Sequence, residues 1–190
     1  MKSQLRILGI DDSPFRFDDE KAMVVGTIVR MPNYLEGVIK SEVTVDGTDS
    51  TETLVKMVAK SRFRDQIKLV MVDGIALAGF NVIDLGEVYS NLGIPVLTLT
   101  RDKPDLDKMK KALMKHFEDW RTRYGLITKH ELRVINTEHN PLYACGIGMD
   151  WSEFEELVRT STVRGVVPEP IRMAHLIASA MAKGESYGRS

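Results

Sequence analysis

Two aspartates stand where two strongly apolar segments end. Asp11 ends the segment LRILGID at 5–11, and Asp73 ends IKLVMVD at 67–73. Short apolar segments of this kind are typical of buried strands. A carboxylate at the end of a buried strand is costly to desolvate unless a partner or a cation compensates its charge. Carboxylate oxygens are hard ligands that suit Mg²⁺, or Mn²⁺ as a second choice, and not zinc. The pair therefore points to a divalent metal site.

A site of this kind could hydrolyse a phosphodiester, because metal ions held by carboxylates activate a water and stabilise the leaving oxygen. Asp46 and Asp49, in VDGTDST, end a third strand-like segment. Either could reach the same crevice if that segment adjoins the first one. Each of these acids also fits local structure: Asp73-Gly74 and Asp46-Gly47 are common turn pairs, and Asp49 suits the first turn of a helix. The residues alone leave both interpretations open.

The segments around these acids alternate between strand and helix patterns. Apolar or alternating segments predict strands at 5–11, 22–31, 35–46, 67–73, 95–100, 131–137 and 142–148. Apolar residues at helical spacing predict helices after Gly47 and at 82–92, 105–117, 151–160 and 169–183. Three strands followed by alternating helices and strands predict an antiparallel first part and parallel crossovers after it. The expected fold class is α/β, with a mixed sheet flanked by helices.

Composition indicates one globular domain over residues 1–190. No apolar run approaches the roughly 18 residues of a spanning helix, and the N-terminus lacks the apolar region of a secretory signal. We therefore expect no membrane contact and a cytoplasmic location. The single cysteine, Cys145, excludes an intramolecular disulfide and a multi-cysteine zinc site. It lies in the apolar segment YACGIG, so we expect it in the core and not as a nucleophile.

The net charge of −1 argues against a protein that coats nucleic acid by bulk charge. Residues 101–133 are nevertheless more basic than acidic, and Lys108, Lys111 and Lys115 share one face of a predicted helix. This face could follow a phosphate backbone, or it could simply be solvated. The chain has no dinucleotide-binding, P-loop or serine-hydrolase motif, which argues against those three classes.

Three stretches, in the same order along the chain, resemble endonuclease V. GIDDS at 9–13 is similar to its G-[IV]-D-x-S motif, and PEPIRMAH at 168–175 is similar to its C-terminal P-E-P-x-R-x-A-[DH] helix. VDGIALAGF at 72–80 and LGIPVLTLTR at 92–101 resemble its V-D-G segment and the next strand, which ends in a basic residue. IDDSPF, VDGTD and the ending GESYGR are closer still to an archaeal branch described as endonuclease dU. The resemblance implies a ribonuclease H-like fold.

The resemblance also implies roles for individual residues. Asp11 and Asp73 match the family's first and second metal-binding aspartates. His175 falls where the family carries Asp or His, and would complete the metal shell or assist proton transfer. Arg101 falls on the basic residue thought to contact phosphate. The family's remaining acid is a glutamate, for which Asp49 is the nearest substitute, with Asp46 second.

Arg172 lies one helical turn before that histidine, on the same face. It could contact the substrate or pair with Glu169. The chain lacks the family's P-Y-[IV]-P wedge and the histidine that follows V-D-G. The resemblance therefore implies phosphodiester cleavage more directly than it implies specificity for inosine. Phe15, Phe80 and Asn81 are candidates to stack on an exposed base or read its edge. Each of them also fits ordinary packing or turn chemistry.

These observations together predict a metal-dependent endonuclease that hydrolyses a phosphodiester near a deaminated base, either deoxyuridine or inosine. Asp11, Asp73 and Asp49 would hold one or two Mg²⁺ ions, or Mn²⁺, and the partner would be nucleic acid, with DNA ahead of RNA. One alternative is a non-catalytic nucleic-acid or nucleotide binding protein on the same fold. Another is an enzyme that takes a small phosphorylated substrate into a closed pocket. The sequence indicates no oligomeric state.

Overall fold

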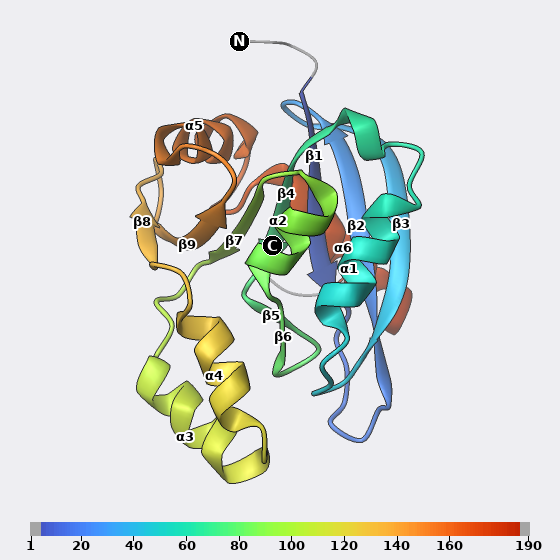
Figure 1. The fold of residues 1–190 in the computed structure, drawn as a ribbon. Helices are drawn as coiled ribbons and strands as arrows, with labels where there is room; N and C mark the ends of the chain where they lie inside the picture. Colours follow the sequence, from blue (N-terminus) through green and yellow to red (C-terminus); the bar gives the residue numbers. More distant parts are fainter. Residues whose placement is uncertain (1–4, 187–190) are drawn as a thin grey trace.

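A computed structural model of the chain describes residues 5–186, and a seven-stranded sheet runs through it (Figure 1). In spatial order its strands are β3 (Tyr34–Thr44), β2 (Lys21–Arg30), β1 (Arg6–Asp12), β4 (Ile67–Asp73), β7 (Val96–Thr100), β9 (Leu142–Ile147) and β8 (Arg133–Ile135). The first three strands are antiparallel, β1, β4 and β7 are parallel, and β9 is antiparallel to β7 and to β8. The predicted mixed sheet is confirmed.

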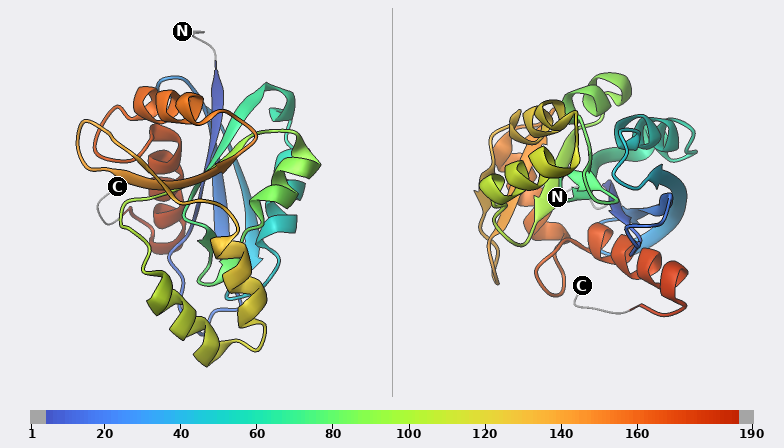
Figure 2. Two further views of the ribbon diagram at one scale, coloured as in Figure 1. Left: turned by 60° about the vertical axis from the view of Figure 1, so that its left-hand side comes forward. Right: turned by 90° about the horizontal axis from the view of Figure 1, so that it is seen from below.

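Helices cover both faces of the sheet (Figure 2). One face packs against α1 (Ser50–Ala59) and α2 (Leu85–Leu92), and the other packs against α5 (Trp151–Ser161) and α6 (Glu169–Lys183). Side chains alternate between the two faces because a strand has a period of two. Leu8, Ile10, Val70 and Val72 therefore join the α1–α2 core, while Ile7, Leu69 and Met71 join the α5–α6 core. The odd-numbered positions of β1 and β4, which include Asp11 and Asp73, lie on the α6 face.

Local signals fix the helix ends. The Asp84 side chain accepts hydrogen bonds from two backbone N–H groups at the start of α2, and Gly93 ends that helix in the left-handed conformation. Asp105 caps α3 (Leu106–His116) by accepting from the Lys108 N–H at 3.0 Å. The predicted strand at 67–73 and helix at 169–183 match β4 and α6 residue for residue. No helix within residues 5–186 is long and apolar enough to cross a membrane.

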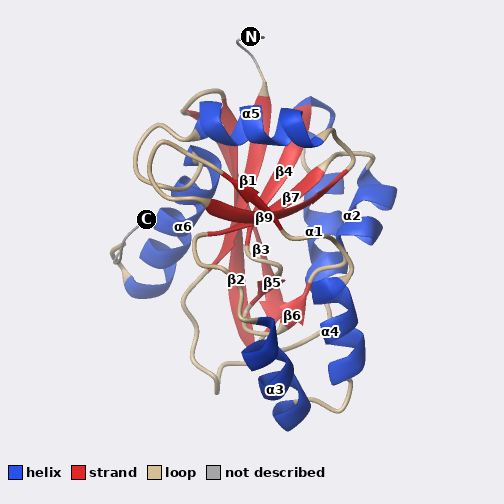
Figure 3. Ribbon diagram, turned by 90° about the vertical axis from the view of Figure 1, so that its left-hand side faces the viewer, coloured by secondary structure: helices blue, strands red, loops and turns tan. Residues whose placement is uncertain are grey.

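Three elements beyond the carboxyl ends of the parallel strands, and one turn before β4, differ from the sequence prediction (Figure 3). The short strands β5 (Ala76–Leu77) and β6 (Asn81–Val82) form a separate hairpin, so α2 begins three residues later than predicted. The helix α4 (Trp120–Thr128) packs beside α3 and was not predicted. Its sequence contains a glycine and buries only Arg123 and Ile127, so it has no apolar stripe to signal a helix. A one-turn 3₁₀ helix at Arg64–Gln66 precedes β4.

A buried arginine fastens α4 to the rest of the fold. Arg123 is 7% exposed, and its Nη1 donates to the backbone carbonyls of Asp46, Gly47 and Phe80 at 2.8, 2.9 and 2.8 Å. Its Nε donates to the Asp119 carboxylate at 2.9 Å. One side chain therefore joins α4 to the turn before α1 and to the β5–β6 hairpin.

We expect Arg123→Met to lower the free energy of unfolding by about 2 kcal/mol, because hydrogen bonds to a charged donor are lost while the hydrocarbon packing is largely kept. Urea denaturation measures this change. Arg121→Met is the matched control, since Arg121 is exposed on the same helix and its guanidinium lies over the Trp120 ring. Equal stabilities of the two variants would contradict the role assigned to Arg123.

Candidate active site

Three of the predicted site residues converge at the carboxyl ends of the parallel strands. The register pairs Ile10 with Val72, so Asp11 and Asp73 are the next residues of β1 and β4. Arg101 directly follows the neighbouring strand β7. The charges of Asp11 and Arg101 both act on Asp73, in opposite directions. Neighbouring parallel strands thus place two aspartates and one arginine at the same end of the sheet.

The position of α6 depends on a glycine in the same motif. A Cβ atom at Gly9 would lie 2.1 Å from the carbonyl carbon of Pro170, so α6 can approach β1 this closely only if residue 9 has no side chain. In the neighbouring strand, the Thr27 hydroxyl donates to the Pro170 carbonyl at 2.6 Å. Docked in this way, α6 brings His175 to Asp11, with 2.8 Å between Nδ1 and Oδ2.

The contact between His175 and Asp11 changes the proton affinity of the histidine. The hydrogen bond to Asp11 raises the pKa of His175 above its ordinary value. Partial burial and Arg101 oppose this shift, while the charges of Asp11 and Asp73 add to it. With Nδ1 oriented by Asp11, Nε2 is the nitrogen that can bind a metal or carry a proton toward substrate.

Asp12 is a site residue to which the sequence analysis assigned no catalytic role. Its Oδ2 accepts the Ala78 N–H at 2.6 Å, and its backbone N–H donates to Asp11 Oδ1 at 2.9 Å. Burial, then the charge of Asp11, raise the pKa of Asp12 to about 6. The only signal in the sequence is its adjacency to Asp11. Asp12 is the last residue of β1, and the period of two along the strand turns its side chain to the face opposite that of Asp11, where it meets Ala78.

The chemistry of this cluster fits a divalent cation. Burial, then the charge of Asp11, raise the pKa of Asp73 to about 7, against the opposing charges of Arg101 and His175. Buried like charges favour a bound cation or a proton. Within residues 5–186, no three His, Cys, Asp or Glu side chains form a group arranged to hold a metal ion. Mg²⁺ commonly uses one or two carboxylates and completes its shell with waters and substrate phosphates, so the donor set matches Mg²⁺.

The structure places Asp49 and Asp46 in another network, beside α1. The Asp49 carboxylate accepts from Asn81 Nδ2 at 2.6 Å and from the Thr44 hydroxyl at 2.9 Å. Burial acts to raise its pKa, but the hydrogen bonds from Asn81 and Thr44 outweigh it and the pKa is lowered. Asp46 accepts from the Phe80 N–H at 2.8 Å. Both carboxylates therefore accept hydrogen bonds from residues of the turn before α1 and of the β5–β6 hairpin.

Asn81 and Phe80, two residues expected to contact a base, both hydrogen-bond to the turn before α1. Asn81 is fully buried; its Oδ1 accepts from the Ser50 N–H, and its Nδ2 donates to the Thr44 carbonyl and to Asp49. Its amide is therefore already hydrogen-bonded within the fold. Phe80 packs edge-on against Phe117, with 5.7 Å between ring centroids. Both residues occupy structural positions.

The other two substrate-contact candidates also have partners in the fold. Arg172 pairs with Glu169, which is 3% exposed, at 2.7 Å between Nη2 and Oε2. This is the pairing that the sequence analysis held open as the alternative. Phe15 packs partly against the core and meets Phe17 edge-on, with ring centroids 5.9 Å apart.

The predicted basic face lies on α3, beyond the carboxyl ends of the parallel strands. Lys108, Lys111 and Lys115 are exposed there, and Lys108 pairs with Asp105 at 3.3 Å. The opposite side of α3 packs through Leu113 and Met109 into a cluster shared with α4 and β6. The lysine face is therefore turned to solvent on the same side of the molecule as the acids.

Comparison with known proteins identifies relatives along the whole chain. Residues 3–182 match the family model described as Endonuclease dU. The UPF0215 protein of Methanosarcina mazei is 40% identical over 193 residues, which cover 100% of this chain and 97% of that protein. The UPF0215 protein of Methanothermobacter thermautotrophicus is 42% identical over 190 residues, which cover 99% of this chain and 93% of that protein.

Solved structures show the same fold. A protein of unknown function from Archaeoglobus fulgidus aligns with a TM-score of 0.84 at 39% identity, covering 94% of this chain and 98% of that one. Ciona intestinalis endonuclease V, bound to a 24mer DNA containing an inosine, aligns with a TM-score of 0.64 at 12% identity, covering 97% and 88%. Marinitoga piezophila Argonaute aligns with a TM-score of 0.56 at 10% identity, covering 93% and 30%. The predicted ribonuclease H-like fold is confirmed. The chain belongs to the family described as Endonuclease dU.

Proposed function

We propose that this protein is a divalent-metal-dependent endonuclease that hydrolyses a phosphodiester near a deaminated base, deoxyuridine or inosine. The observation that carries the proposal is the set of acids at the ends of β1 and β4, which Arg101 and His175 flank. The resemblance of the fold to nucleases supports the same reaction class. Asp12 lies close enough for its charge to act on Asp73, and Asp49, the third acid expected from sequence, accepts hydrogen bonds within the turn before α1.

Each side chain has a role that follows from its geometry. Asp11 and Asp73 would hold Mg²⁺ or Mn²⁺, and the ion, when bound, would lower the pKa of a water and stabilise negative charge on the scissile phosphate. Asp11 also orients His175 through the 2.8 Å contact, so that Nε2 faces away from the acid and can accept or deliver a proton. Arg101 neutralises part of the phosphate charge.

The proposed substrate is nucleic acid, and DNA is favoured over RNA. The endonuclease V neighbour from Ciona intestinalis binds DNA that contains an inosine. In this chain, the exposed lysines of α3 would contact backbone phosphates on either side of the cleavage position. Such contacts carry no sequence information, so they set affinity and orientation and leave selection of the base to another part of the surface.

An incision assay tests the proposal. Labelled DNA and RNA oligonucleotides with one deoxyuridine (uridine in RNA), one inosine or no lesion are incubated with the protein and Mg²⁺ or Mn²⁺. We expect lesion-dependent nicking that a chelator abolishes. Asp11→Asn should slow nicking by more than the roughly 10- to 100-fold typical of losing an outer-shell partner. Asp65→Asn, at an acid that is 90% exposed, is the matched control and should cleave as the wild type does. Nicking that persists in Asp11→Asn would rule the site out.

A second candidate is a nucleic-acid binding protein without catalysis. The observation that favours it is that residues 5–186 form no group of three metal-ligating side chains. This candidate predicts salt-dependent binding of the same oligonucleotides with no nicking in either metal. The incision assay with a parallel binding measurement separates the two candidates.

A further inference from the structure

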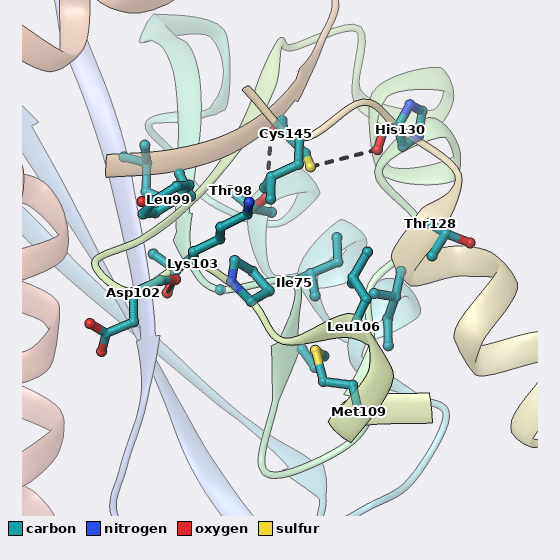
Figure 4. Close-up of a pocket in the computed structure, with 17 residues that line it drawn as sticks. Ile75, Thr98, Leu99, Asp102, Lys103, Leu106, Met109, Thr128, His130 and Cys145 are labelled. Carbon is teal, nitrogen blue, oxygen red and sulfur yellow. Dashed lines mark hydrogen bonds between the residues drawn. The ribbon is translucent and has the colours of Figure 1, made fainter. Parts of the chain in front are cut away.

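A hollow of about 310 Å³ lies at the end of the sheet opposite the acids, at the upper end of β1 in Figure 1. Its walls come from the start of β1, the end of β2, the start of β3 and the loop after α1. A larger cavity of about 450 Å³, between the sheet and the α3–α4 hairpin, lies beside the acids instead, since its lining begins at Gly74, directly after Asp73 (Figure 4). The smaller hollow is therefore a surface separate from the proposed active site.

Positive charge is concentrated in the smaller hollow. Arg6, Arg30 and Arg62 line it together with a single carboxylate, that of Glu36. Arg6 Nη2 donates to Glu36 Oε1 at 3.1 Å, and Arg30 Nε lies 3.3 Å from the same oxygen. Because one carboxylate cannot neutralise three guanidinium groups, the lining keeps a formal charge of +2, in a chain whose net charge is −1. A ligand of this hollow is therefore expected to be an anion.

Two aromatic rings in the same lining lie against these guanidinium groups. The Cζ atom of Arg30 is 4.7 Å from the centroid of the Tyr34 ring, and that of Arg62 is 4.8 Å from the centroid of the Phe63 ring. A Cβ atom at Gly37 would lie 2.6 Å from the Phe63 ring, so this ring packs directly on the backbone of β3. The Tyr34 side chain, in contrast, is 58% exposed.

This combination suits an unpaired strand of nucleic acid. Guanidinium groups bind phosphate oxygens in a bidentate manner, and exposed aromatic rings stack on bases that have no pairing partner. An acidic protein segment would use the arginines but would leave the Tyr34 ring without a planar partner. A fully paired duplex would do the same, because its bases are stacked inside the helix.

The distance between the hollow and the acids is one that a nucleic-acid strand can span. Arg6 and Asp12 are the two ends of β1, whose seven residues extend over about 20 Å at roughly 3.3 Å per residue. At about 3.4 Å per phosphate, at least about six nucleotides are needed to reach from one end to the other.

We infer that this hollow, the amino-end arginine site formed by Arg6, Arg30, Arg62 and Tyr34, binds the phosphates and one base of an unpaired nucleic-acid strand at a distance from the scissile phosphate. The inference rests on the proposed function for the identity of the ligand, because the proposed substrate is nucleic acid. It goes beyond that function by adding a second contact surface, at the other end of the sheet.

Binding measured without cleavage tests the inference. Fluorescence anisotropy follows a labelled 20-nucleotide strand without a lesion, titrated with full-length protein in the presence of a chelator. Arg62→Gln should weaken binding about fivefold and reduce the slope of log affinity against log salt by about 0.7, the value for one phosphate contact on a single strand. Tyr34→Ala should weaken binding about tenfold and leave the slope unchanged, because stacking involves no counterion. Arg159→Gln is the matched control, since Arg159 is 56% exposed on α5 and also pairs with a glutamate, and it should bind as the wild type does.

A blunt duplex of the same sequence is the second probe, and Tyr34→Ala should bind it as tightly as the wild type does. An equal loss on duplex and single strand would overturn the assignment of an unpaired strand. Wild-type affinity for the single strand in both Arg62→Gln and Tyr34→Ala would overturn the whole inference and leave an acidic protein segment as the partner to test. The chelator prevents metal-dependent cleavage throughout, so a failure of the nuclease proposal appears separately, as absent nicking in the incision assay.

Discussion

The metal-free Asp73→Asn variant should unfold several degrees above the wild type at pH 8. Burial, followed by the charge of Asp11, raises the pKa of Asp73 from 3.8 to about 7. The folded protein is therefore more stable with the Asp73 carboxyl protonated than with it ionised. As the pH rises from about 4 to about 7, the unfolded chain releases a proton that the folded chain retains, and stability falls. Asparagine resembles the protonated acid and escapes this loss.

The size of the effect follows from the shift. About 1.4 kcal/mol per pKa unit gives an upper bound of roughly 4 kcal/mol, and coupling to the neighbouring acids and Arg101 reduces the expected gain to about 2 kcal/mol. For a chain of this length that gain corresponds to a rise in Tm of about 4 to 8 °C. The same substitution should abolish most metal-dependent cleavage, because it removes a proposed ligand.

Thermal melts of the metal-free proteins at pH 4 and pH 8 measure the difference, with Asp65→Asn as the exposed control. The advantage of Asp73→Asn should be small at pH 4, where the folded state keeps the proton and the unfolded state has lost only part of it, and full at pH 8. Added Mg²⁺ should raise the Tm of the wild type and raise that of the variant much less. An advantage of equal size at both pH values would show that the charge of Asp73 is not its cause.

Gly9→Ala is expected to destabilise the protein by more than about 3 kcal/mol. The added Cβ would lie 2.1 Å from the Pro170 carbonyl carbon and 2.6 Å from the Ile171 nitrogen. These are backbone atoms of a docked helix, which cannot move aside as a side chain can, so the cost should exceed the usual 1–3 kcal/mol of overpacking. Displacing α6 would also separate His175 from Asp11, so cleavage should fall together with stability.

The matched control is Gly125→Ala, since a Cβ at Gly125 meets nothing within 4 Å and the residue lies inside α4. That variant should gain up to about 1 kcal/mol, because alanine favours a helix over glycine. Urea denaturation gives both values, and the His175 imidazole resonances report whether the contact with Asp11 persists. A Gly9→Ala protein as stable as the wild type, with His175 resonances unchanged, would show that α6 does not depend on this close approach.

The sequence by itself predicted that Asp11 and Asp73 lie together, at the centre of the proposed active site. Asp11 and Asp73 end segments whose continuous apolar character requires burial on both faces, and parallel strands bring such ends to one edge. The α6 sequence has a helical period, prolines at its start and a glycine after its end, so both of its limits were readable. These features are local, and each is encoded within a few residues.

What only the tertiary structure decided depends on contacts between distant segments. Arg123 holds α4 in place by donating a hydrogen bond to the carbonyl of Asp46, 77 residues away in the sequence. No residue near Arg123 in the sequence indicates that hydrogen bond. The amide of Asn81 donates to Asp49 across 32 residues, a hydrogen bond that the sequence around Asp49 does not indicate. The Asp12 carboxylate accepts the N–H of Ala78, 66 residues away, and the cavity of Figure 4 exists only where the α3–α4 hairpin closes over β7 and β9. Side-chain hydrogen bonds and cavities form when remote elements pack, so periodicity and motif spacing carry no record of them.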